Sequence, residues 1–394
     1  MSASQLDGAC AEKRLLVACA RTRMDSSSAG QIRELLSQPL DWEYVLAQAA
    51  ENSIVPLLEK QLRAVAPDSV PSVHMEWLKS ARRTNVVRCL FLASQLTKIL
   101  ARFESAGIQA IPYKGPVLAI QAYGDVTLRD FDDLDIILRQ SDMPKANAIM
   151  LALGYQARFP WILANGENSS MVPGEYNYRD DSRRTMVELH TERTFRHFPR
   201  RADIDDFATR LEQVEFAGNG IVCFSPEDTL VLLCIHGAKD FWERLSWIAD
   251  VSELIQAHSL AWEEVFARSE AIAATRMLCV GLSLAGELHG APLPAKVSDR
   301  IRRDKVAAFV ASQVSLRTLS RDLAPLSAAG RFRFRSRMVR GHFAGLRYGM
   351  RLAVVPAEED WEMIRLPASL SPFYLALRPL RLLRKYGWIS RSPQ

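Results

Sequence analysis

The spacing of apolar residues changes near Gly107, and this change constrains the fold more than any other feature of the chain. From Glu12 to about Glu104, apolar residues recur every three or four positions, as in EYVLAQAAENSIVPLLEKQL. That is the period of helices that bury one face. Beyond Gly107, short apolar runs of strand length alternate with turns that contain glycine. The pattern predicts a helical region followed by a segment that contains a sheet.

Within the second segment, IQAIPYKG predicts a short strand that ends in a Lys-Gly turn, and PVLAIQAYG predicts a helix with proline in its first turn. FDDLDIILRQ begins with alternating apolar and acidic residues and becomes wholly apolar, which is typical of a strand that runs into a core. A helix, MPKANAIMLALG, should end at Gly154. Further strands are predicted in YQARF, EYNYRD, TMVELHTE and QVEFAGNGIVCFS.

Helical periodicity resumes after Ser225, a good N-cap before Pro226. We therefore expect an α+β protein with three regions. Residues 1–106 form a helical N-terminal region, residues 107–225 form a core with a small mixed sheet, and residues 226–394 form a helical C-terminal region with a basic tail.

Composition indicates a globular chain, because 48% of the 394 residues are hydrophobic. No run of about 18 apolar residues is present, so we expect neither a secretory signal nor a membrane-spanning helix. We therefore expect a cytoplasmic location. The cysteines include no CxxC pair, which favours reduced thiols in the core over disulfides or a zinc site. They are Cys10, Cys19, Cys89, Cys223, Cys234 and Cys279.

The small positive net charge, +5, is unevenly distributed. Seven arginines and no acidic residue lie between Arg331 and Arg351, and a second basic cluster follows near the end of the chain. The second cluster consists of Arg378, Arg381, Arg384 and Lys385. Two interpretations stay open: attraction of partners that carry phosphate, or a solvated or internally ion-paired surface.

An acidic pair in the predicted strand FDDLDIILRQ points to metal chemistry. Residues i and i+2 of a strand project from the same face, so Asp133 and Asp135 should point together, about 7 Å apart at the backbone. This spacing suits two carboxylates that share two metal ions about 3.5 to 4 Å apart. Magnesium prefers such hard oxygen ligands. Leu134 should face the opposite side, into the core.

A third carboxylate on a neighbouring strand would complete the shell of the second metal. Glu188 is the candidate, because Val187 and Leu189 should point away from the cleft. His190 should share the face of Glu188 and orient the acceptor or a metal-bound water. Upstream, Lys114 and Gly115 form a turn that opens a helix, where a lysine and backbone N–H groups suit phosphate binding.

The run YKGPVLAIQAYGDVTLRDFDDLDIIL, with VELH downstream, resembles the bacterial uncharacterised nucleotidyltransferase family, a branch of the DNA polymerase beta-like superfamily. The resemblance extends to DWEYVLAQAAENSIVPLL and LCIHGAKDFWERLSWIADVSELI and so covers most of the chain. The positions that match the family's motifs are Lys114, Gly115, Tyr123, Arg129, Asp133, Asp135, Glu188, Leu189 and His190. One position departs from the wider superfamily: Pro116 replaces a residue that donates an N–H to phosphate.

The resemblance implies a nucleotidyltransferase core and a magnesium-dependent enzyme, with two ions expected. It would transfer a nucleoside monophosphate from a nucleoside triphosphate, with ATP as the default, to a hydroxyl or phosphate on a small molecule, a peptide or another macromolecule, and release pyrophosphate. Catalysis would fall to Asp133, Asp135, Glu188 and His190, the first three as metal ligands. Nucleotide binding would involve Lys114, Gly115, Arg129 and Lys239.

Several alternatives stay open. Arg129 either neutralises phosphate charge or pairs with Asp130 or Asp132 in its loop. Lys239 lies in a helical stretch that lines either a nucleotide or acceptor cleft, or a buried helix pair with satisfied polar groups. That stretch also contains His236, Arg244, Trp247 and Asp250. The acceptor could instead be RNA bound by the basic stretch, and a catalytically silent binding module would have the same fold.

Overall fold

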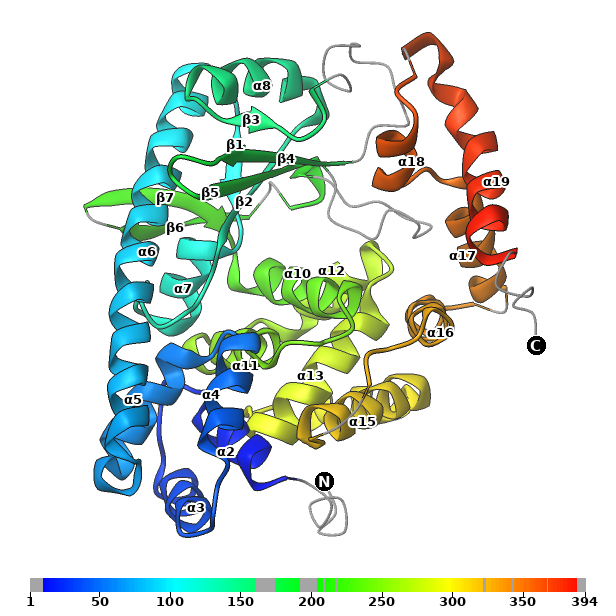
Figure 1. Ribbon diagram of the computed structural model, residues 1–394. Coiled ribbons are helices and arrows are strands. Elements are labelled where there is room, and N and C mark those ends of the chain that lie inside the picture. The colour runs from blue at the N-terminus through cyan, green and yellow to red at the C-terminus, as the bar shows by residue number, and fades with distance from the viewer. Residues whose placement is uncertain are drawn as a thin grey trace, which may run out of the picture. The chain divides into compact units, whose positions relative to one another are not determined.

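The computed structural model describes residues 10–160, 174–191, 204–207, 210–216, 218–321, 324–341, 343–366 and 368–387 (Figure 1). The chain folds into two compact units, each built from three segments of sequence. Unit 1 contains Met1–Thr97, Pro112–Asp132 and Arg210–Met338, and unit 2 contains Lys98–Ile111, Asp133–Thr209 and Val339–Gln394. The region boundaries at residues 106 and 225 stay a prediction.

The N-terminal part of unit 1 is helical, as its apolar spacing predicts. Its elements are α2 (Ala11–Cys19), α3 (Ser26–Leu36), α4 (Trp42–Glu51), α5 (Val55–Val65), the 3-10 turn η1 (Pro67–Ser69) and the long α6 (Ser72–Ser105), which belongs to unit 1 as far as Thr97. Side chains fix where two of these helices begin. Asp25 accepts a hydrogen bond from the Ser28 N–H, and Asp41 accepts one from the Tyr44 N–H. Each satisfies an N–H that the helix itself leaves unpaired.

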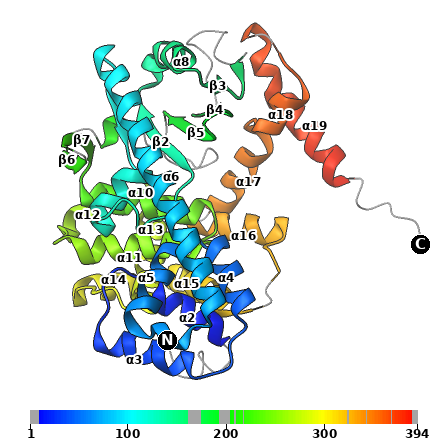
Figure 2. The same cartoon turned by 60° about the vertical axis from the view of Figure 1, so that its left-hand side comes forward.

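The rest of unit 1 contains one hairpin and most of the remaining helices. These are α7 (Gly115–Tyr123), β6 (Leu211–Phe216), β7 (Asn219–Phe224), α10 (Pro226–Lys239), α11 (Leu245–Ala257), α12 (Trp262–Ala271), α13 (Thr275–His289), α14 (Ala295–Arg303), α15 (Lys305–Leu319) and α16 (Ala328–Met338). Ser225 caps α10, as the sequence predicts, by accepting from the Asp228 N–H. The apolar α13 packs against α10, α11 and α15 and forms the centre of this core (Figures 1 and 2).

Unit 2 is built on a mixed sheet with strand order β1-β2-β5-β4-β3. β2 and β5 are parallel, and β4 is antiparallel to both β5 and β3. The strands are β1 (Ala110–Pro112), β2 (Asp133–Leu138), β3 (Gln156–Ala157), β4 (Glu175–Asp180) and β5 (Thr185–His190). The remaining elements are η2 (Gln140–Asp142), α8 (Met143–Ala152), η3 (Ile204–Asp206), α17 (Ala344–Val354), α18 (Glu358–Met363), η4 (Ala368–Phe373) and α19 (Tyr374–Gly387). This mixed sheet, with helical regions before and after it in the chain, confirms the predicted α+β class.

The two faces of the sheet differ in chemistry. Leu134 of β2 and Val187 of β5 are register partners on one face, and both are fully buried. Tyr178 of β4 shares that face, and its hydroxyl donates to Asn147 Oδ1 of α8 at 2.9 Å. Helix α8 therefore covers the apolar face. The alternate residues of β2, β4 and β5 place their polar side chains on the other face.

The second basic cluster is partly internal to unit 2. Arg378 of α19 donates to Asp360 Oδ2 of α18 at 2.9 Å, and Arg381 pairs with the same carboxylate. Both the Arg378 side chain and Asp360 are buried. For these two arginines the structure confirms the interpretation as an internal ion-pairing surface. Lys385 has no described side chain.

All six cysteines are free thiols, as expected, and five of them are buried. Among the described residues, no helix is both long enough and apolar enough to cross a membrane.

Candidate active site

Two carboxylates face each other across the parallel strands of unit 2. Asp135 of β2 and Glu188 of β5 are register partners, and Asp133 lies two residues earlier on the same face, opposite Met186. Asp135 is buried, whereas the Glu188 side chain keeps about a fifth of its surface exposed. Strand alternation therefore brings together the carboxylates that the sequence predicts for one face.

His190 joins this pair. Its Nε2 lies 2.9 Å from Asp135 Oδ1 and 3.4 Å from Glu188 Oε2, and its Nδ1 lies 3.8 Å from Glu175 Oε2. Burial lowers the pKa of the imidazole, but the hydrogen bonds with Asp135 and Glu188 and the negative charge of Glu175 outweigh it and raise the pKa to about 9. At neutral pH the ring is protonated, so Nε2 donates to Asp135 and the positive charge also faces Glu175.

Ligand atoms of Asp135, Glu188 and His190 all lie within 4.8 Å of one another, which is compact enough to hold a metal ion. The two carboxylates offer the hard oxygen atoms that magnesium prefers. The imidazole of His190 is the third possible ligand, and it also hydrogen-bonds to Asp135. Asp133 lies outside this compact group.

Two further polar residues lie on the same face, in β4, and neither is among the site residues predicted from the sequence. Glu175 is the register partner of His190, and Asn177 is the register partner of Glu188. The buried Oδ1 of Asn177 accepts no hydrogen bond from the described residues. The alternation of polar and tyrosine residues in EYNYRD carries this information, since it places Glu175 and Asn177 on one face.

A tight turn fixes the register of β4 against β5. Asp180 Oδ1 accepts from the backbone N–H groups of Ser182 at 3.0 Å and Arg183 at 3.1 Å. An aspartate that bonds backbone groups two and three residues ahead stabilises such turns. Because a shift by one residue would reverse every side chain in β5, this turn helps to keep Glu188 and His190 on the polar face.

The Lys-Gly turn belongs to unit 1. Lys114 is the N-cap residue of α7, and Gly115 has a φ of 54°, in the left-handed region that favours glycine. The Lys114 side chain is buried, with its Nζ 5.0 Å from the ring centroid of Tyr113. Pro116 follows in the first turn, as the sequence predicts.

Arg129 forms a buried ion pair within unit 1. Its Nε and Nη2 donate to the two oxygens of Asp250 in α11, at 2.9 and 3.0 Å. Tyr123 of α7 donates to the same carboxylate at 2.6 Å. Neither loop acid suggested by the sequence is this partner, and Asp132 is an exposed residue paired with Arg88. Asp250 is therefore a buried, hydrogen-bonded residue, as the interpretation of this helical stretch as a buried helix pair expects.

Lys239, near the C-terminus of α10, is half-buried, and its carbonyl accepts from Arg335 Nη2 at 2.9 Å. His236, one turn earlier, pairs with Asp240 and packs edge-on against the Trp247 ring, with the ring centroids 5.0 Å apart. Arg244 stacks over the same indole. The cleft interpretation of Lys239 stays a prediction.

The predicted site residues thus fall into two sets. The carboxylates and His190 belong to unit 2, and Lys114, Gly115, Arg129 and Lys239 belong to unit 1. That the two sets bind the same nucleotide stays a prediction.

Comparison with known proteins agrees with the chemistry of these residues. Residues 38–290 match the model of a protein family described as "Uncharacterised nucleotidyltransferase". The match includes every site residue discussed above. No curated protein and no solved structure matches the chain.

Proposed function

We propose, since the chain belongs to the family of uncharacterised nucleotidyltransferases, that it transfers a nucleoside monophosphate from a nucleoside triphosphate to an acceptor and releases pyrophosphate. The observation that carries this proposal is the register pair of Asp135 and Glu188, with His190 bonded to Asp135. ATP is the proposed donor, and a hydroxyl or phosphate group of a small molecule or peptide is the proposed acceptor.

The donor set fits a divalent cation. Asp135 and Glu188 would hold magnesium, and Asp133, on the same face, would add a ligand for a second ion. Bound magnesium would neutralise charge on the triphosphate and favour ionisation of the acceptor hydroxyl. The fully buried Leu134, Val187 and Leu189 hold the backbone of both strands, so the carboxylates are positioned by the core of the sheet.

His190 acts on the carboxylates in this proposal. Its protonated ring donates from Nε2 to Asp135 and Glu188, while Nδ1 faces Glu175. A buried cation beside three carboxylates offsets their mutual repulsion and fixes their orientation. This arrangement favours a positioning role for His190 over direct orientation of the acceptor.

Lys114 and Gly115 are the proposed binders of triphosphate. A left-handed glycine at the start of α7 turns the chain sharply into the helix, and a helix N-terminus favours a bound anion. Lys114 would add a positive charge, and Lys239 could add a second. Arg129 already donates to both oxygens of Asp250. Its proposed role is therefore structural: it holds α11 against the segment that contains Arg129.

Labelled nucleotides test the reaction class. Purified protein, magnesium and host lysate are incubated with ATP labelled either at the α-phosphorus or at the γ-phosphorus. The proposal expects an acceptor labelled only from the α position, with the γ label released in pyrophosphate. Parallel reactions use GTP, CTP and UTP to identify the base, and nuclease or protease treatment of the product identifies the acceptor class.

The control is the Asp135→Asn variant, which keeps the size of the side chain and removes its charge. It should give no labelled acceptor. Label transferred from the γ position would indicate a phosphotransferase, and no labelled acceptor with any wild-type reaction would favour a silent binding module.

A further inference from the structure

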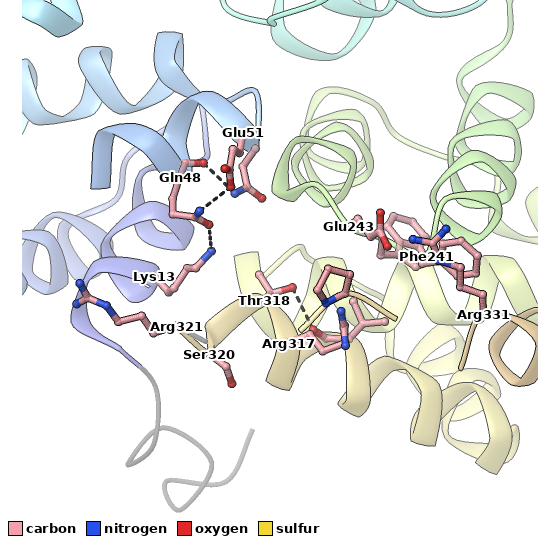
Figure 3. Close-up of a pocket in the computed structure, with 14 residues that line it drawn as sticks. Lys13, Gln48, Glu51, Phe241, Glu243, Arg317, Thr318, Ser320, Arg321 and Arg331 are labelled. Atoms are coloured by element: carbon pink, nitrogen blue, oxygen red, sulfur yellow. Dashed lines mark hydrogen bonds between the residues drawn. The ribbon is translucent and has the colours of Figure 1, made fainter. Parts of the chain in front are cut away.

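Unit 1 contains a cavity of about 520 Å³ that none of the residues proposed above lines. Its walls come from α2, α4, the α10–α11 connection, α15 and the start of α16. Lys13, Gln48 and Glu51 stand on one side, and Phe241, Glu243 and Arg331 stand on the other (Figure 3). The volume lies within the range of about 300 to 1,000 Å³ that is usual for small-molecule sites.

One wall is built from strained backbone. Phe241 and Trp242 have φ values of 61° and 54°, a region that bulky side chains rarely adopt. Trp242 is buried, and its ring lies against α10 and α13. A Cβ added to Gly237 of α10 would lie 2.5 Å from the ring, and one added to Gly281 of α13 would lie 3.0 Å from it. Successive strained residues persist where surrounding packing holds them, and they cluster at ligand sites. The fold therefore maintains Phe241 in an unusual position at the cavity.

The cavity has an excess of positive charge. Four basic side chains line it, Lys13, Arg317, Arg321 and Arg331, against two acidic ones, Glu51 and Glu243. Arg321 is neutralised by Glu12 and Asp41. Lys13 bonds to the amide oxygen of Gln48, whose amide nitrogen donates to Glu51 at 2.6 Å. Charge on this side of the cavity is thus largely balanced.

Arg317 and Arg331 differ, because their hydrogen-bond partners are neutral. Arg317 Nη2 donates to the Ala324 carbonyl at 3.2 Å, and Arg331 Nε donates to the Leu326 carbonyl at 3.1 Å. Neither forms an ion pair with a carboxylate in the part of the chain that the structure describes. A guanidinium has five N–H donors, so each keeps donors for an anion. Arg331 also lies 5.6 Å from the Phe241 ring centroid.

We propose that this cavity binds a small organic anion that carries a ring. Arg317 and Arg331 hold its phosphate or carboxylate group. Its ring lies against the apolar part of the wall that Phe241, Val314 and Pro325 form. Arginine suits this task because its planar fork matches both anionic groups and stacks on aromatic rings. None of the residues proposed for nucleotidyl transfer lines this cavity.

Phenyl phosphate is a suitable probe, since it has both features and contains no transferable nucleotide. Calorimetry on the full-length protein should show one bound molecule, with inorganic phosphate binding more weakly. Arg331→Gln should weaken phenyl phosphate binding at least about tenfold, as expected for a lost charge-assisted bond. Arg333→Gln is the matched control: it lies on the same helix, is also exposed and contacts a backbone carbonyl, but does not line the cavity.

Each outcome decides the proposal. It is overturned if phenyl phosphate does not bind, if the two arginine variants weaken binding equally, or if inorganic phosphate binds as tightly as phenyl phosphate. Asp135→Asn should leave the affinity unchanged, because that carboxylate belongs to the proposed metal site. Loss of binding in Asp135→Asn would place the probe at the nucleotidyl-transfer site and contradict the cavity proposal without affecting the proposed function.

Discussion

Asp135 and Glu188 are register partners on adjacent parallel strands, and His190 Nε2 lies within hydrogen-bond distance of both carboxylates. A buried carboxylate such as Asp135 is costly unless a charge or hydrogen-bond donor compensates it. The protonated His190 ring provides both. The carboxylates are therefore held in place before any cation binds. Metal binding by Glu188 and positioning of the carboxylates by His190 can then be separated by mutation.

Glu188→Gln and His190→Gln should differ in what they damage. Glutamine at position 188 removes a charged oxygen ligand, so turnover and Mn²⁺ affinity should both fall. Glutamine at position 190 removes a positive charge near the carboxylates, so Mn²⁺ affinity should not fall, while turnover falls by a factor on the order of a hundred to ten thousand. Mn²⁺ titration alongside labelled-nucleotide assays measures both. Equal loss of Mn²⁺ affinity in the two variants would assign His190 as a metal ligand.

Lys114→Ala should weaken ATP binding by about 1.5 to 3 kcal/mol, the usual effect of losing a charge-assisted hydrogen bond. Lys114→Arg keeps the charge and should retain most of the affinity. Calorimetry with ATP and a non-hydrolysable analogue makes the comparison. An unchanged dissociation constant in Lys114→Ala would remove this residue from the nucleotide site.

Gly115→Ala tests the backbone of the same turn. The φ of 54° places any Cβ in an unfavourable position, so alanine should lower the free energy of unfolding by about 1 to 2 kcal/mol. Urea denaturation measures the change. Gly30→Ala is the control, because Gly30 lies within α3 and an added Cβ would meet no atom within 4 Å. A stable Gly115→Ala variant would show that this turn adopts another conformation.

Asp250→Asn should be strongly destabilising. Arg129 and Tyr123 both donate to this buried carboxylate, and removal of one partner from a buried pair typically costs about 3 to 5 kcal/mol. Asp132→Asn breaks the exposed pair with Arg88 and should cost at most about 1 kcal/mol. Urea denaturation of both variants tests the contrast, which similar losses would contradict.

His289 should make the protein sensitive to acid. Burial, together with the charge of Arg21, lowers the pKa of this imidazole to about 3. Above pH 6.5 the ring is neutral in both the folded and unfolded states. Between pH 6.5 and pH 3 the unfolded state binds the proton first, so the free energy of unfolding falls by up to about 1.4 kcal/mol per pH unit.

The His289→Gln variant isolates this contribution. Its free energy of unfolding should fall less steeply than that of the wild type when urea denaturation is followed from pH 7 to pH 4. Parallel curves for the two proteins would show that His289 is hydrated or paired in solution.

Much of the polar face was predictable because strand alternation is local. The pattern DLDIIL predicts the faces of Asp135 and Leu134, and VELH predicts those of Glu188 and His190. The register of β2 and β5 agrees with this assignment, because it pairs Asp135 with Glu188 and Leu134 with Val187. Helix boundaries marked by a capping side chain were also predictable, as for Ser225 before α10.

Contacts between distant segments were not predictable from local patterns. Arg129 and Asp250 are 121 residues apart, and nothing near Arg129 distinguishes Asp250 from the loop acids. The strained Phe241 and Trp242 likewise depend on Gly237 and Gly281, whose missing side chains leave room for the indole. Such features arise from packing, which one-dimensional periodicity does not encode.

Metal binding by the two opposed carboxylates is the central claim, and Mn²⁺ titration followed by electron paramagnetic resonance tests it most directly. The account predicts that wild-type protein binds Mn²⁺ in the presence of a non-hydrolysable ATP analogue and that magnesium displaces it. Asp135→Asn and Glu188→Gln should each lose this binding while retaining the wild-type circular dichroism spectrum. Unchanged Mn²⁺ binding in both variants would contradict the account.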